Sequence, residues 1–374
     1  MSENNDFFSR PSYKDGCQLE VLVVDDSAVV RQVLTNILSQ DPCINVNVAS
    51  DPIIAMTKMK RLRPDVIILD LDMPRMDGLT FLRKLMAEDP IPVVICSREA
   101  GHGTEMALRA LREGAVEIVA KPRVGVRGFL EESATVLIDA VHEAAVAKIK
   151  GKKRPPAPFF YDSEIRDKLP ADVILPLPKR LAVNPIGIKL IAIGASAGGT
   201  EALREILKQL PVTSPGIVIV QHMPEGFTAA FARQLDYHSK MKVKEAETGD
   251  VISEGKAYVA PGNKHTLIRR SVNEYVIEII NGPLISRHRP SVDVLFRSAA
   301  LVCGSDAVGV ILTGMGDDGA QGLLEMKTSG ADTVAQDEAS STVFGMPREA
   351  INRGAVDRIV PLKFIPDVIL DLIS

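Results

Sequence analysis

The chain has 374 residues, of which 46% are hydrophobic and 25% are charged, a balance typical of folded globular proteins rather than disordered ones. This length suits two domains of ordinary size. The net charge is −4, and residues 187–374 carry 19 Lys and Arg against 22 Asp and Glu, so neither half shows the basic balance of a typical nucleic-acid-binding domain.

The N-terminal residues 1–18 are polar and lack the apolar stretch of a signal peptide, so we expect a loosely ordered tail. No apolar run approaches the ~18 residues that a membrane helix needs. The cysteines are dispersed and form no CxxC pair, which argues against a zinc site or a disulfide framework. We therefore expect a soluble, cytoplasmic protein that binds no nucleic acid and does not insert into membranes.

Residues 19–140 alternate short runs of Val, Ile and Leu with amphipathic stretches. The predicted strands are 19–24, 46–50, 65–71, 92–97 and 117–122, and the predicted helices are 27–40, 79–87, 105–115 and 129–149. Uninterrupted apolar strands that alternate with helices indicate a parallel sheet covered on both faces. We expect an α/β domain over residues 19–140.

Polar side chains stand at the carboxyl ends of these strands, which meet at one edge of a parallel sheet. They are Asp25, Asp26, Asp70, Ser97 and Lys121. Three carboxylates would suit a hard cation such as Mg²⁺, and one could accept a phosphoryl group whose charge the lysine and the hydroxyl balance. Any one of these residues alone is better explained as a helix cap or turn residue, but five at matching strand ends favour the site.

Residues 141–186 are rich in proline and charge and predict a linker, with apolar residues that could dock on either domain. From residue 187 to 374 the alternation resumes. Strands are predicted at 189–194, 216–221 and 307–314, and helices at 200–210 and 228–237. Strand-like pieces at 241–246, 257–260 and 265–280, with hairpin-style turns such as Pro261-Gly262-Asn263, indicate a β-rich insert in a second α/β domain.

Ser196 lies in the segment Gly-Ala-Ser-Ala-Gly-Gly, directly after the 189–194 strand and before a predicted helix. A nucleophilic serine needs such a sharp turn with small neighbours, and the helix N-terminus offers N–H groups to an oxyanion. The alternative is a glycine loop that cradles a phosphate, although neither G-x-G-x-x-G nor a Walker lysine is present.

A general base for Ser196 is His222, which ends the next strand along the chain. His265 and His288 are the alternatives, but His265 lies in the β-rich insert. His288 lies in an Arg-His-Arg cluster that could bind a substrate carboxylate or form a solvated loop. A single histidine is more often structural than catalytic, and the strand-end position favours His222.

The base needs an orienting carboxylate, and the strand at 307–314 leads to Asp317 and Asp318, which spacing alone does not separate. One of the two is expected to form a turn or a helix cap. Asp293 is a weaker candidate because it lies inside a predicted helix. The resulting chain order, Ser-His-Asp, differs from that of the α/β-hydrolases and indicates a different fold.

The N-terminal half resembles the flavodoxin-like (βα)5 receiver domain of two-component response regulators. The resemblance implies that Asp70 is phosphorylated, that Asp25 and Asp26 join it in binding Mg²⁺, and that Ser97 and Lys121 contact the phosphate. One departure is Ile118, where receivers often carry an aromatic switch residue.

The C-terminal half resembles the chemotaxis protein-glutamate methylesterase family, with a doubly wound parallel sheet. The matching segments are IAIGASAGGTEALR, QHMPEGFT, YVAPGNKH, RHRPSVDVLF, GVILTGMGDDGAQG and FGMPREAI. The resemblance implies that Ser196, His222 and Asp318 form a catalytic triad without a cofactor, with backbone N–H groups of Ala197 and Met315 as the oxyanion hole. Ala197 stands where the family often has Thr.

The resemblance further implies hydrolysis of glutamate γ-methyl esters on methyl-accepting chemotaxis receptors and deamidation of receptor glutamines. A histidine kinase would be the phosphodonor, and the unphosphorylated receiver would cover the active site. Two other functions fit the pattern less well: a non-enzymatic regulator with a DNA-binding output domain, and a receiver joined to a nucleotide-binding module. The first predicts a short basic helical domain, and the second predicts no reactive serine.

Overall fold

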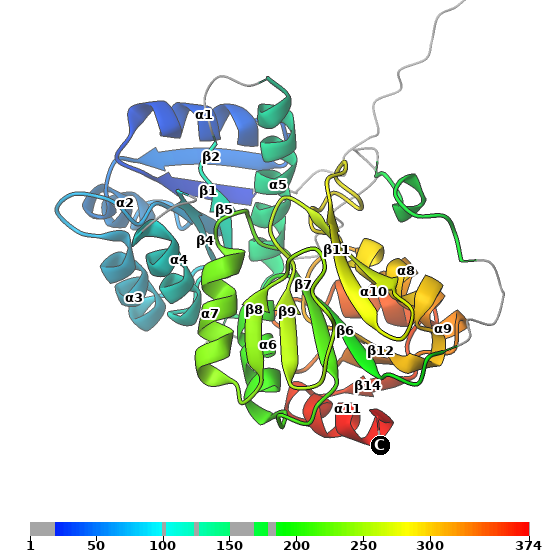
Figure 1. Ribbon diagram of the computed structural model, residues 1–374. Helices are drawn as coiled ribbons and strands as arrows, with labels where there is room; N and C mark the ends of the chain where they lie inside the picture. Colours follow the sequence, from blue (N-terminus) through cyan, green and yellow to red (C-terminus); the bar gives the residue numbers. More distant parts are fainter. Residues whose placement is uncertain (1–18, 99–101, 123–126, 150–167, 179–184, 374) are drawn as a thin grey trace, which may run out of the picture.

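The computed structural model describes residues 19–98, 102–122, 127–149, 168–178 and 185–373. The chain forms two α/β domains, and the long helix α5 (Arg127–Val146) lies between them (Figure 1). Both predicted domains are therefore present, each around its own parallel sheet. The expected N-terminal tail, and Phe159 and Phe160 of the linker, lie outside the described residues.

The described N-terminal domain has a parallel sheet with strand order β2-β1-β3-β4-β5. Its strands are β1 (Leu19–Val24), β2 (Ile44–Ala49), β3 (Val66–Leu69), β4 (Val93–Ser97) and β5 (Glu117–Ala120). Its other helices are α1 (Ala28–Leu38), α2 (Pro52–Met59), α3 (Gly78–Glu88) and α4 (His102–Arg112). Of these, α2 is an addition to the helices expected from the sequence.

Apolar strands and capped helices explain this domain locally. Every residue of β3 is buried, as expected for a central strand covered on both faces. Asp51 and Asp77 accept hydrogen bonds from the first backbone N–H groups of α2 and α3, at 2.9 Å from Ile53 and 2.8 Å from Thr80. These aspartates therefore have the capping role that we weighed for the carboxylates at strand ends.

The helix α5 continues to Val146, past residue 140, where we expected the domain to end. Its last turns carry buried alanines and valines that pack on α1 and the sheet. Part of the expected linker also packs on the C-terminal domain. The short 3₁₀ helix η2 (Ala171–Val173) and Leu175 bury apolar side chains there, beside Leu267 and Val294.

The described C-terminal domain has a parallel sheet with strand order β14-β13-β12-β6-β7-β9-β8 and a separate antiparallel pair, β10-β11. The strands are β6 (Leu190–Ala195), β7 (Gly216–Gln221), β8 (Lys242–Glu245), β9 (Lys256–Val259), β10 (His265–Arg270), β11 (Tyr275–Ile280), β12 (Ala307–Ile311), β13 (Asp332–Gln336) and β14 (Arg358–Val360). The helices are α6 (Gly199–Gln209), α7 (Thr228–His238), α8 (Val292–Val302), α9 (Ala320–Thr328), α10 (Met346–Asn352) and α11 (Ile365–Ile373), with 3₁₀ helices η3 (Gly304–Asp306) and η4 (Leu362–Phe364).

The β-rich insert differs from expectation in one respect. β8 and β9 join the main sheet in parallel, and only β10 and β11 form a hairpin. The turn Pro261-Gly262-Asn263 therefore connects two different sheets and is not a hairpin turn. Gly262 packs against the loop before α7, where a Cβ atom would lie 2.4 Å from the backbone nitrogen of Glu225. This tertiary contact has no signal in the local sequence.

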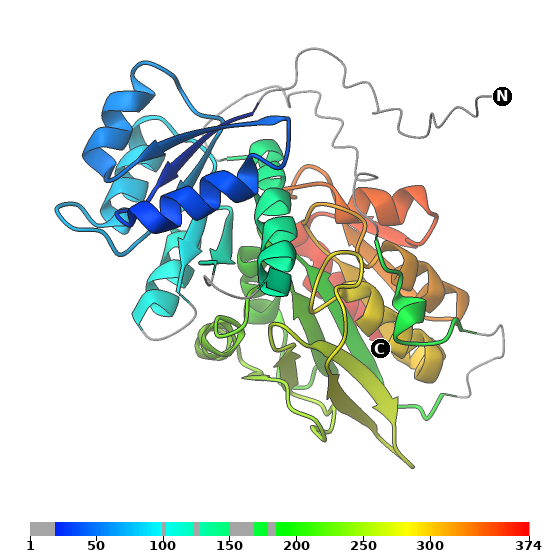
Figure 2. The same cartoon turned by 90° about the horizontal axis from the view of Figure 1, so that it is seen from above.

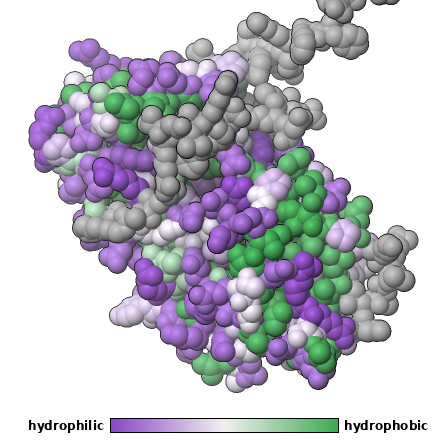
Figure 3. Space-filling view, turned by 45° about the horizontal axis from the view of Figure 1, so that its top comes forward, coloured by the Kyte–Doolittle hydropathy of each residue, from purple (hydrophilic) through white to green (hydrophobic). Residues whose placement is uncertain are grey.

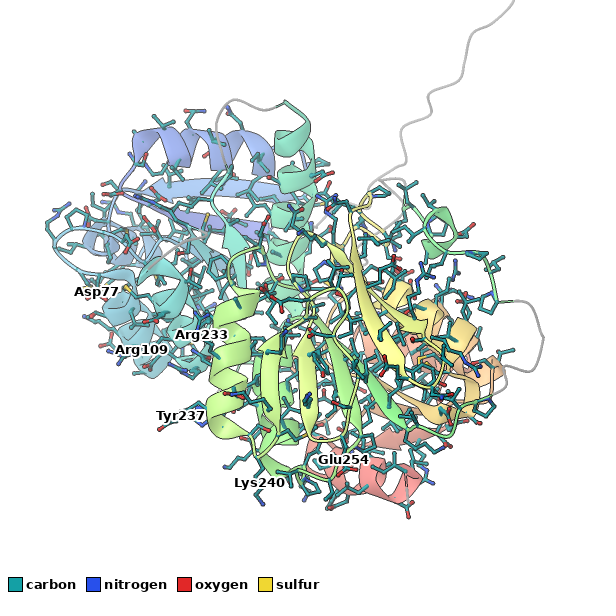
Figure 4. The ribbon with its side chains drawn as sticks, viewed as in Figure 1. Asp77, Arg109, Arg233, Tyr237, Lys240 and Glu254 are labelled. Atoms are coloured by element: carbon teal, nitrogen blue, oxygen red, sulfur yellow. The ribbon has the colours of Figure 1, made fainter. Side chains whose placement is uncertain are left out.

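The two domains meet along α5 and α4. Seen from above, α5 stands between the N-terminal sheet and the C-terminal domain (Figure 2). α4 packs against α7, and Arg109 and Arg233 mark the two sides of this contact (Figure 4). Polar residues cover most of the visible face of both domains. Apolar residues gather on the part of that face that belongs to the C-terminal domain (Figure 3). Within the described residues, none of the helices combines the length and apolar character that a membrane crossing requires.

Candidate functional sites

The first site is the acidic cluster at the carboxyl edge of the N-terminal sheet. One carboxylate oxygen from each of Asp25, Asp26 and Asp70 lies within 4.8 Å of the others. Asp25 and Asp70 are buried, whereas Asp26 is exposed. Three oxygen ligands of this kind fit a hard divalent cation with part of its coordination shell left to water. The residues predicted for Mg²⁺ thus lie together.

Lys121 joins the same cluster, with its Nζ 2.8 Å from Asp25 Oδ2 and 2.6 Å from Asp70 Oδ2. Burial raises the pKa of Asp70 above its usual value, although the hydrogen bond from Lys121 acts in the opposite direction. Ser97 is buried at the end of β4, and Ile118 is buried in the core. The five strand-end residues therefore gather at one edge, as the parallel sheet predicts.

The start of α3 packs directly behind Asp70. A Cβ atom on Gly78 would lie 2.2 Å from the carbonyl oxygen of Asp70, so only glycine fits this contact. Asp77 caps the helix beside it. Asp77 and Gly78 thus fix the start of α3 against the loop that carries Asp70.

The second site begins with Ser196, which follows β6 directly and precedes α6. Gly198 caps α6 with φ +78°, a conformation that glycine adopts without strain. The backbone N–H of Gly199 donates to the Ser196 carbonyl at 2.7 Å, which closes the turn. A Cβ atom on Gly198 would lie 2.3 Å from Thr342 Oγ1, so this close approach also favours glycine at position 198.

The turn at Ser196 is tied to the loop that follows β12. The Ser196 N–H donates to the Thr313 carbonyl at 3.0 Å, and the Thr313 hydroxyl donates to the Ala197 carbonyl at 2.8 Å. A Cβ atom on Gly314 would lie 2.7 Å from Ser196 Cβ. The close approach of these two loops therefore depends on glycine at position 314.

His222 lies beside Ser196 because β6 and β7 are paired in parallel up to Ala195 and Gln221. Paired residues in parallel strands lie on the same face of the sheet. The His222 N–H donates to the Ala195 carbonyl at 3.0 Å, and Gln221 Nε2 donates to the Ser196 carbonyl at 2.9 Å. The two candidate catalytic residues are thus neighbours at one sheet edge, both buried.

His222 Nε2 lies 2.8 Å from Asp318 Oδ2. Burial acts to raise the pKa of Asp318, but the hydrogen bond from His222, the nearby histidines and the backbone N–H of Asp293 together lower it below the usual value. An ionised carboxylate only accepts, so Nε2 carries the proton. Within the described residues, Nδ1 of His222 is buried without a hydrogen-bond partner. In the tautomer with its proton on Nε2, Nδ1 is the unprotonated nitrogen that a general base requires.

The N-terminus of α8 holds the Asp318 carboxylate in place. The N–H groups of Val292 and Asp293 donate to it at 2.7 and 3.0 Å, and the Ser291 hydroxyl donates at 2.8 Å. A helix N-terminus stabilises negative charge. We did not predict this support. The sequence signal for it is Ser291 as a helix cap, one residue after Pro290.

The alternatives for the carboxylate have other partners. Asp317 pairs with Lys168 at 2.8 Å and with Arg353 at 3.3 Å. Asp293 accepts from the Gly322 N–H at 2.8 Å, and burial followed by the charge of Asp318 raises its pKa. Of the three aspartates, Asp318 alone has a recorded hydrogen bond to His222 within the described residues.

The alternatives for the histidine also have defined places. His265 Nε2 donates to the Pro283 carbonyl at 2.8 Å, and burial lowers its pKa. His288 stacks on His222, with ring centroids 3.7 Å apart and the planes 9° from parallel. Burial, followed by the charge of His222, lowers the pKa of His288 well below the usual value. A neutral ring thus restricts the orientation of His222.

Ala197 and Met315, predicted to supply the oxyanion hole, flank Ser196 on two loops. Within the described residues, neither of their N–H groups donates to a backbone carbonyl. Ala197 is buried in a cluster with apolar residues of α5, and Met315 packs against the same cluster. Helix α5 therefore lies over the position where a substrate carbonyl would bind.

Helix α5 also contacts Ser196 itself. The Ser196 hydroxyl donates to Glu143 Oε2 at 3.3 Å, although the two residues belong to different domains. Two further acidic residues of α5 form ion pairs with the C-terminal domain: Asp139 Oδ1 lies 3.3 Å from Arg287 Nη1, and Glu132 Oε2 lies 2.8 Å from Arg289 Nη2. The arginine cluster around His288 is thus not a solvated loop, because Arg287 is only 8% exposed.

The carboxyl group of Glu143 lies in an unusual environment for a glutamate. Burial, followed by the negative charge of Glu117, raises its pKa well above the usual value. Burial also raises the pKa of Glu117, which shares a hydrogen bond with Glu143. Two carboxyl groups in contact need a shared proton. We did not predict either glutamate, since each lies in a segment with no motif.

Comparisons with known proteins assign both domains to families. Residues 191–369 match the model of the CheB methylesterase family, and residues 21–126 match the response regulator receiver domain. The crystal structure of the Thermotoga maritima CheB methylesterase catalytic domain is 38% identical, with a TM-score of 0.49, and the match covers 51% of this chain and 100% of that one.

Curated relatives match over almost the full length. A protein-glutamate methylesterase/protein-glutamine glutaminase of Anaeromyxobacter dehalogenans is 60% identical, over 95% of this chain and 96% of that one. One from Geobacter metallireducens is 55% identical, over 95% and 99%. These matches confirm the resemblance noted in both halves of the sequence. The chain belongs to the protein-glutamate methylesterase/protein-glutamine glutaminase family, with an N-terminal receiver domain.

Proposed function

We propose that the protein hydrolyses glutamate γ-methyl esters on methyl-accepting chemotaxis receptors in the cytoplasm, under the control of its receiver domain. The same site would deamidate receptor glutamines. The observation that carries this proposal is the bond of 2.8 Å between His222 and Asp318, with Ser196 at the adjacent strand end. Family membership supports the choice of substrate.

The reaction begins when Ser196 Oγ attacks the γ-carbonyl carbon and His222 Nδ1 takes the serine proton. Asp318 stabilises the imidazolium, and the N–H groups of Ala197 and Met315 stabilise the oxyanion. Collapse of the tetrahedral intermediate expels methanol, which receives the proton from His222. Water then attacks the acyl-enzyme by the same route and releases a glutamate carboxylate. With a glutamine substrate the leaving group is ammonia.

Control would come from Asp70, which accepts a phosphoryl group from a histidine kinase. Asp25, Asp26 and Asp70 would hold Mg²⁺, whose charge offsets that of the phosphoryl oxygens. Lys121 and Ser97 would then contact the phosphate. Because α5 lies over Ser196, phosphorylation would act by favouring a form in which α5 leaves the site.

Two variants test these roles separately. Ser196→Ala should abolish methanol release from methylated receptor membranes, by on the order of 10³-fold or more, while Asp70 is still phosphorylated by a small-molecule phosphodonor. Asp70→Asn should keep the basal methanol release and lose its stimulation by the phosphodonor. Methanol release that persists in Ser196→Ala would reject the assignment of the nucleophile.

A further inference from the structure

Three acidic residues of α5 face the catalytic domain. Glu132, Asp139 and Glu143 are separated by seven and four residues, which places them on one face of the helix. Each contacts a different residue of the catalytic domain, respectively Arg289, Arg287 and Ser196. The contact is thus a line of carboxyl groups on a helix that crosses the active site.

The residue that reaches the nucleophile is itself a glutamate. The Ser196 hydroxyl donates to its carboxyl oxygen at 3.3 Å, while Nδ1 of His222 has no recorded partner. Burial, and then the charge of Glu117, raises the pKa of Glu143, which favours the neutral form of this carboxyl. A neutral glutamic acid resembles a glutamate ester or a glutamine in size, polarity and charge.

The side chain of Arg289 and the backbone of Arg287 are held by bonds within the catalytic domain. Arg289 Nε donates to Asn263 Oδ1 at 2.9 Å and Nη1 donates to the Gly282 carbonyl at 2.7 Å, which leaves Nη2 directed at Glu132. Arg287 lies in a tight turn in which the backbones of Ile285 and His288 bond each other at 2.8 and 3.1 Å. The guanidinium group of Arg289 would therefore stay in place after α5 leaves, and the backbone that carries Arg287 would keep its turn.

We propose that α5 occupies the binding position of the substrate helix, and that Arg287 and Arg289 bind carboxylates on that helix four and eleven residues before the target glutamate. This inference rests on the proposed function. The spacing follows from Asp139 and Glu132, which precede Glu143 by four and eleven residues. Arginine suits this role because it binds carboxylates through fixed, charge-assisted hydrogen bonds. Arg287 and Arg289 are thus specificity-determining residues.

The test compares two helical peptides, each carrying one glutamate γ-methyl ester. One peptide has glutamates four and eleven positions before the ester, and the other has glutamines there. Full-length protein is activated with a small-molecule phosphodonor and Mg²⁺, and methanol release gives KM and kcat. The acidic peptide should have a KM about tenfold lower, because charge-assisted hydrogen bonds are the stronger kind.

Matched variants distinguish the role of Arg289 in substrate binding from its role in the ion pair with Glu132 of α5. Arg289→Ala should raise the activity without phosphodonor about two- to fivefold, as expected for loss of a partly exposed ion pair. In the activated protein it should also raise KM for the acidic peptide by a similar factor. Glu132→Ala should raise only the activity without phosphodonor. Hydrolysis of a small neutral ester by activated Arg289→Ala should equal that of the wild type, which checks the fold.

Equal KM values for the two peptides would overturn the inference. An Arg289→Ala variant with raised basal activity and an unchanged KM for the acidic peptide would also overturn it, because the arginine would then serve only to hold the receiver. Failure of the proposed function is distinct, since no methanol would be released from any ester, including methylated receptor membranes.

Discussion

The two candidate sites of this protein both lie at the carboxyl edge of a parallel sheet, but they differ in what contacts their buried residues. In the receiver domain, Asp26 is exposed and the buried Asp25 and Asp70 are paired with Lys121. In the catalytic domain, Ser196 lies beneath α5 and its hydroxyl is bound to Glu143. Asp70 and Ser196 are each 2% exposed, but the chain covers Ser196 with a helix of the other domain.

The difference suggests that regulation acts on access and not on the assembly of the catalytic residues. His222 and Asp318 are already bonded at 2.8 Å in the covered form, and the N-terminus of α8 holds the carboxylate. The catalytic residues would therefore need little rearrangement when α5 moves away from Ser196. Changes within the triad should therefore affect every form of the enzyme, whereas changes in α5 should affect the unphosphorylated form.

The largest effect is expected from Asp318→Asn. The amide cannot stabilise an imidazolium, and it favours the wrong tautomer of His222, so kcat should fall by on the order of 10³- to 10⁴-fold. The fall should be equal with and without phosphodonor. Methanol release from methylated receptor membranes gives the measurement.

Asp317→Asn is the matched control for that experiment. Asp317 pairs with Lys168 and Arg353, and its side chain is 27% exposed. Loss of such ion pairs costs at most about 1 kcal/mol, so activity should stay within about fivefold of the wild type. If instead Asp317→Asn lost activity and Asp318→Asn kept it, the assignment of the orienting carboxylate would be reversed.

A smaller effect is expected from Glu143→Ala. It removes the hydrogen bond to Ser196 and leaves a gap under α5, which should weaken the covered form by about 1–3 kcal/mol. Activity without phosphodonor should rise roughly 5- to 100-fold, up to the level of the phosphorylated wild type. The activated kcat should not change. A basal activity equal to that of the wild type would show that Glu143 does not hold the covered form.

The positions of both candidate sites could be predicted from the sequence, but the contact of α5 with Ser196 could not. Strand ends and glycine-rich turns are local signals, so Asp70 and Ser196 were found from their neighbours in the chain. The contact between Glu143 and Ser196 joins residues 53 positions apart in different domains. No periodicity encodes it, because α5 has acidic residues on several of its turns. The support of Asp318 by α8 escaped prediction for the same reason.

The second α/β domain was predicted, while the arrangement of its insert was not. Alternating strands near 241–260 fit a hairpin as well as a parallel edge, and in the structure β8 and β9 pair in parallel at the edge of the main sheet. Tertiary contacts outweigh local pattern at such short strands.

A pH effect of intermediate size should follow from the pair of carboxyl groups under α5. The raised pKa of Glu143, beside Glu117 and Asp139 and near His222, means that the covered form binds more protons than an open form with ordinary carboxyls. The covered form is thus fully favoured below the ordinary pKa of about 4.3. It is lost as the pH rises through the raised pKa.

The ratio of activity without phosphodonor to activity with it should therefore increase with pH, by at most about tenfold per pH unit for each proton released. Using the ratio cancels any pH dependence of the chemical step that both measurements share. Glu117→Gln removes one of the two coupled carboxyls and should make the increase shallower. A ratio that is constant from pH 5 to pH 8 would argue against a shared proton at this contact.

The smallest effect on activity is expected from Glu143→Gln, which keeps a neutral side chain of the same shape and an oxygen that accepts from Ser196. Its basal activity should stay within about fivefold of the wild type, because the hydrogen bond and the packing survive. If α5 lies as a substrate does, the new amide is also presented to the nucleophile. Slow deamidation would restore the glutamate, raise the mass by about 1 Da and release ammonia.

The mass change should be absent from the double variant Glu143→Gln with Ser196→Ala, and present at the same position in repeated preparations analysed by peptide mass spectrometry. Conversion in the double variant would show ordinary chemical deamidation instead. A stable amide in the single variant would show that the side chain meets the Ser196 hydroxyl from a direction that does not allow attack. α5 would then cover the catalytic site without occupying the position of a substrate, a sharper distinction than activity alone can give.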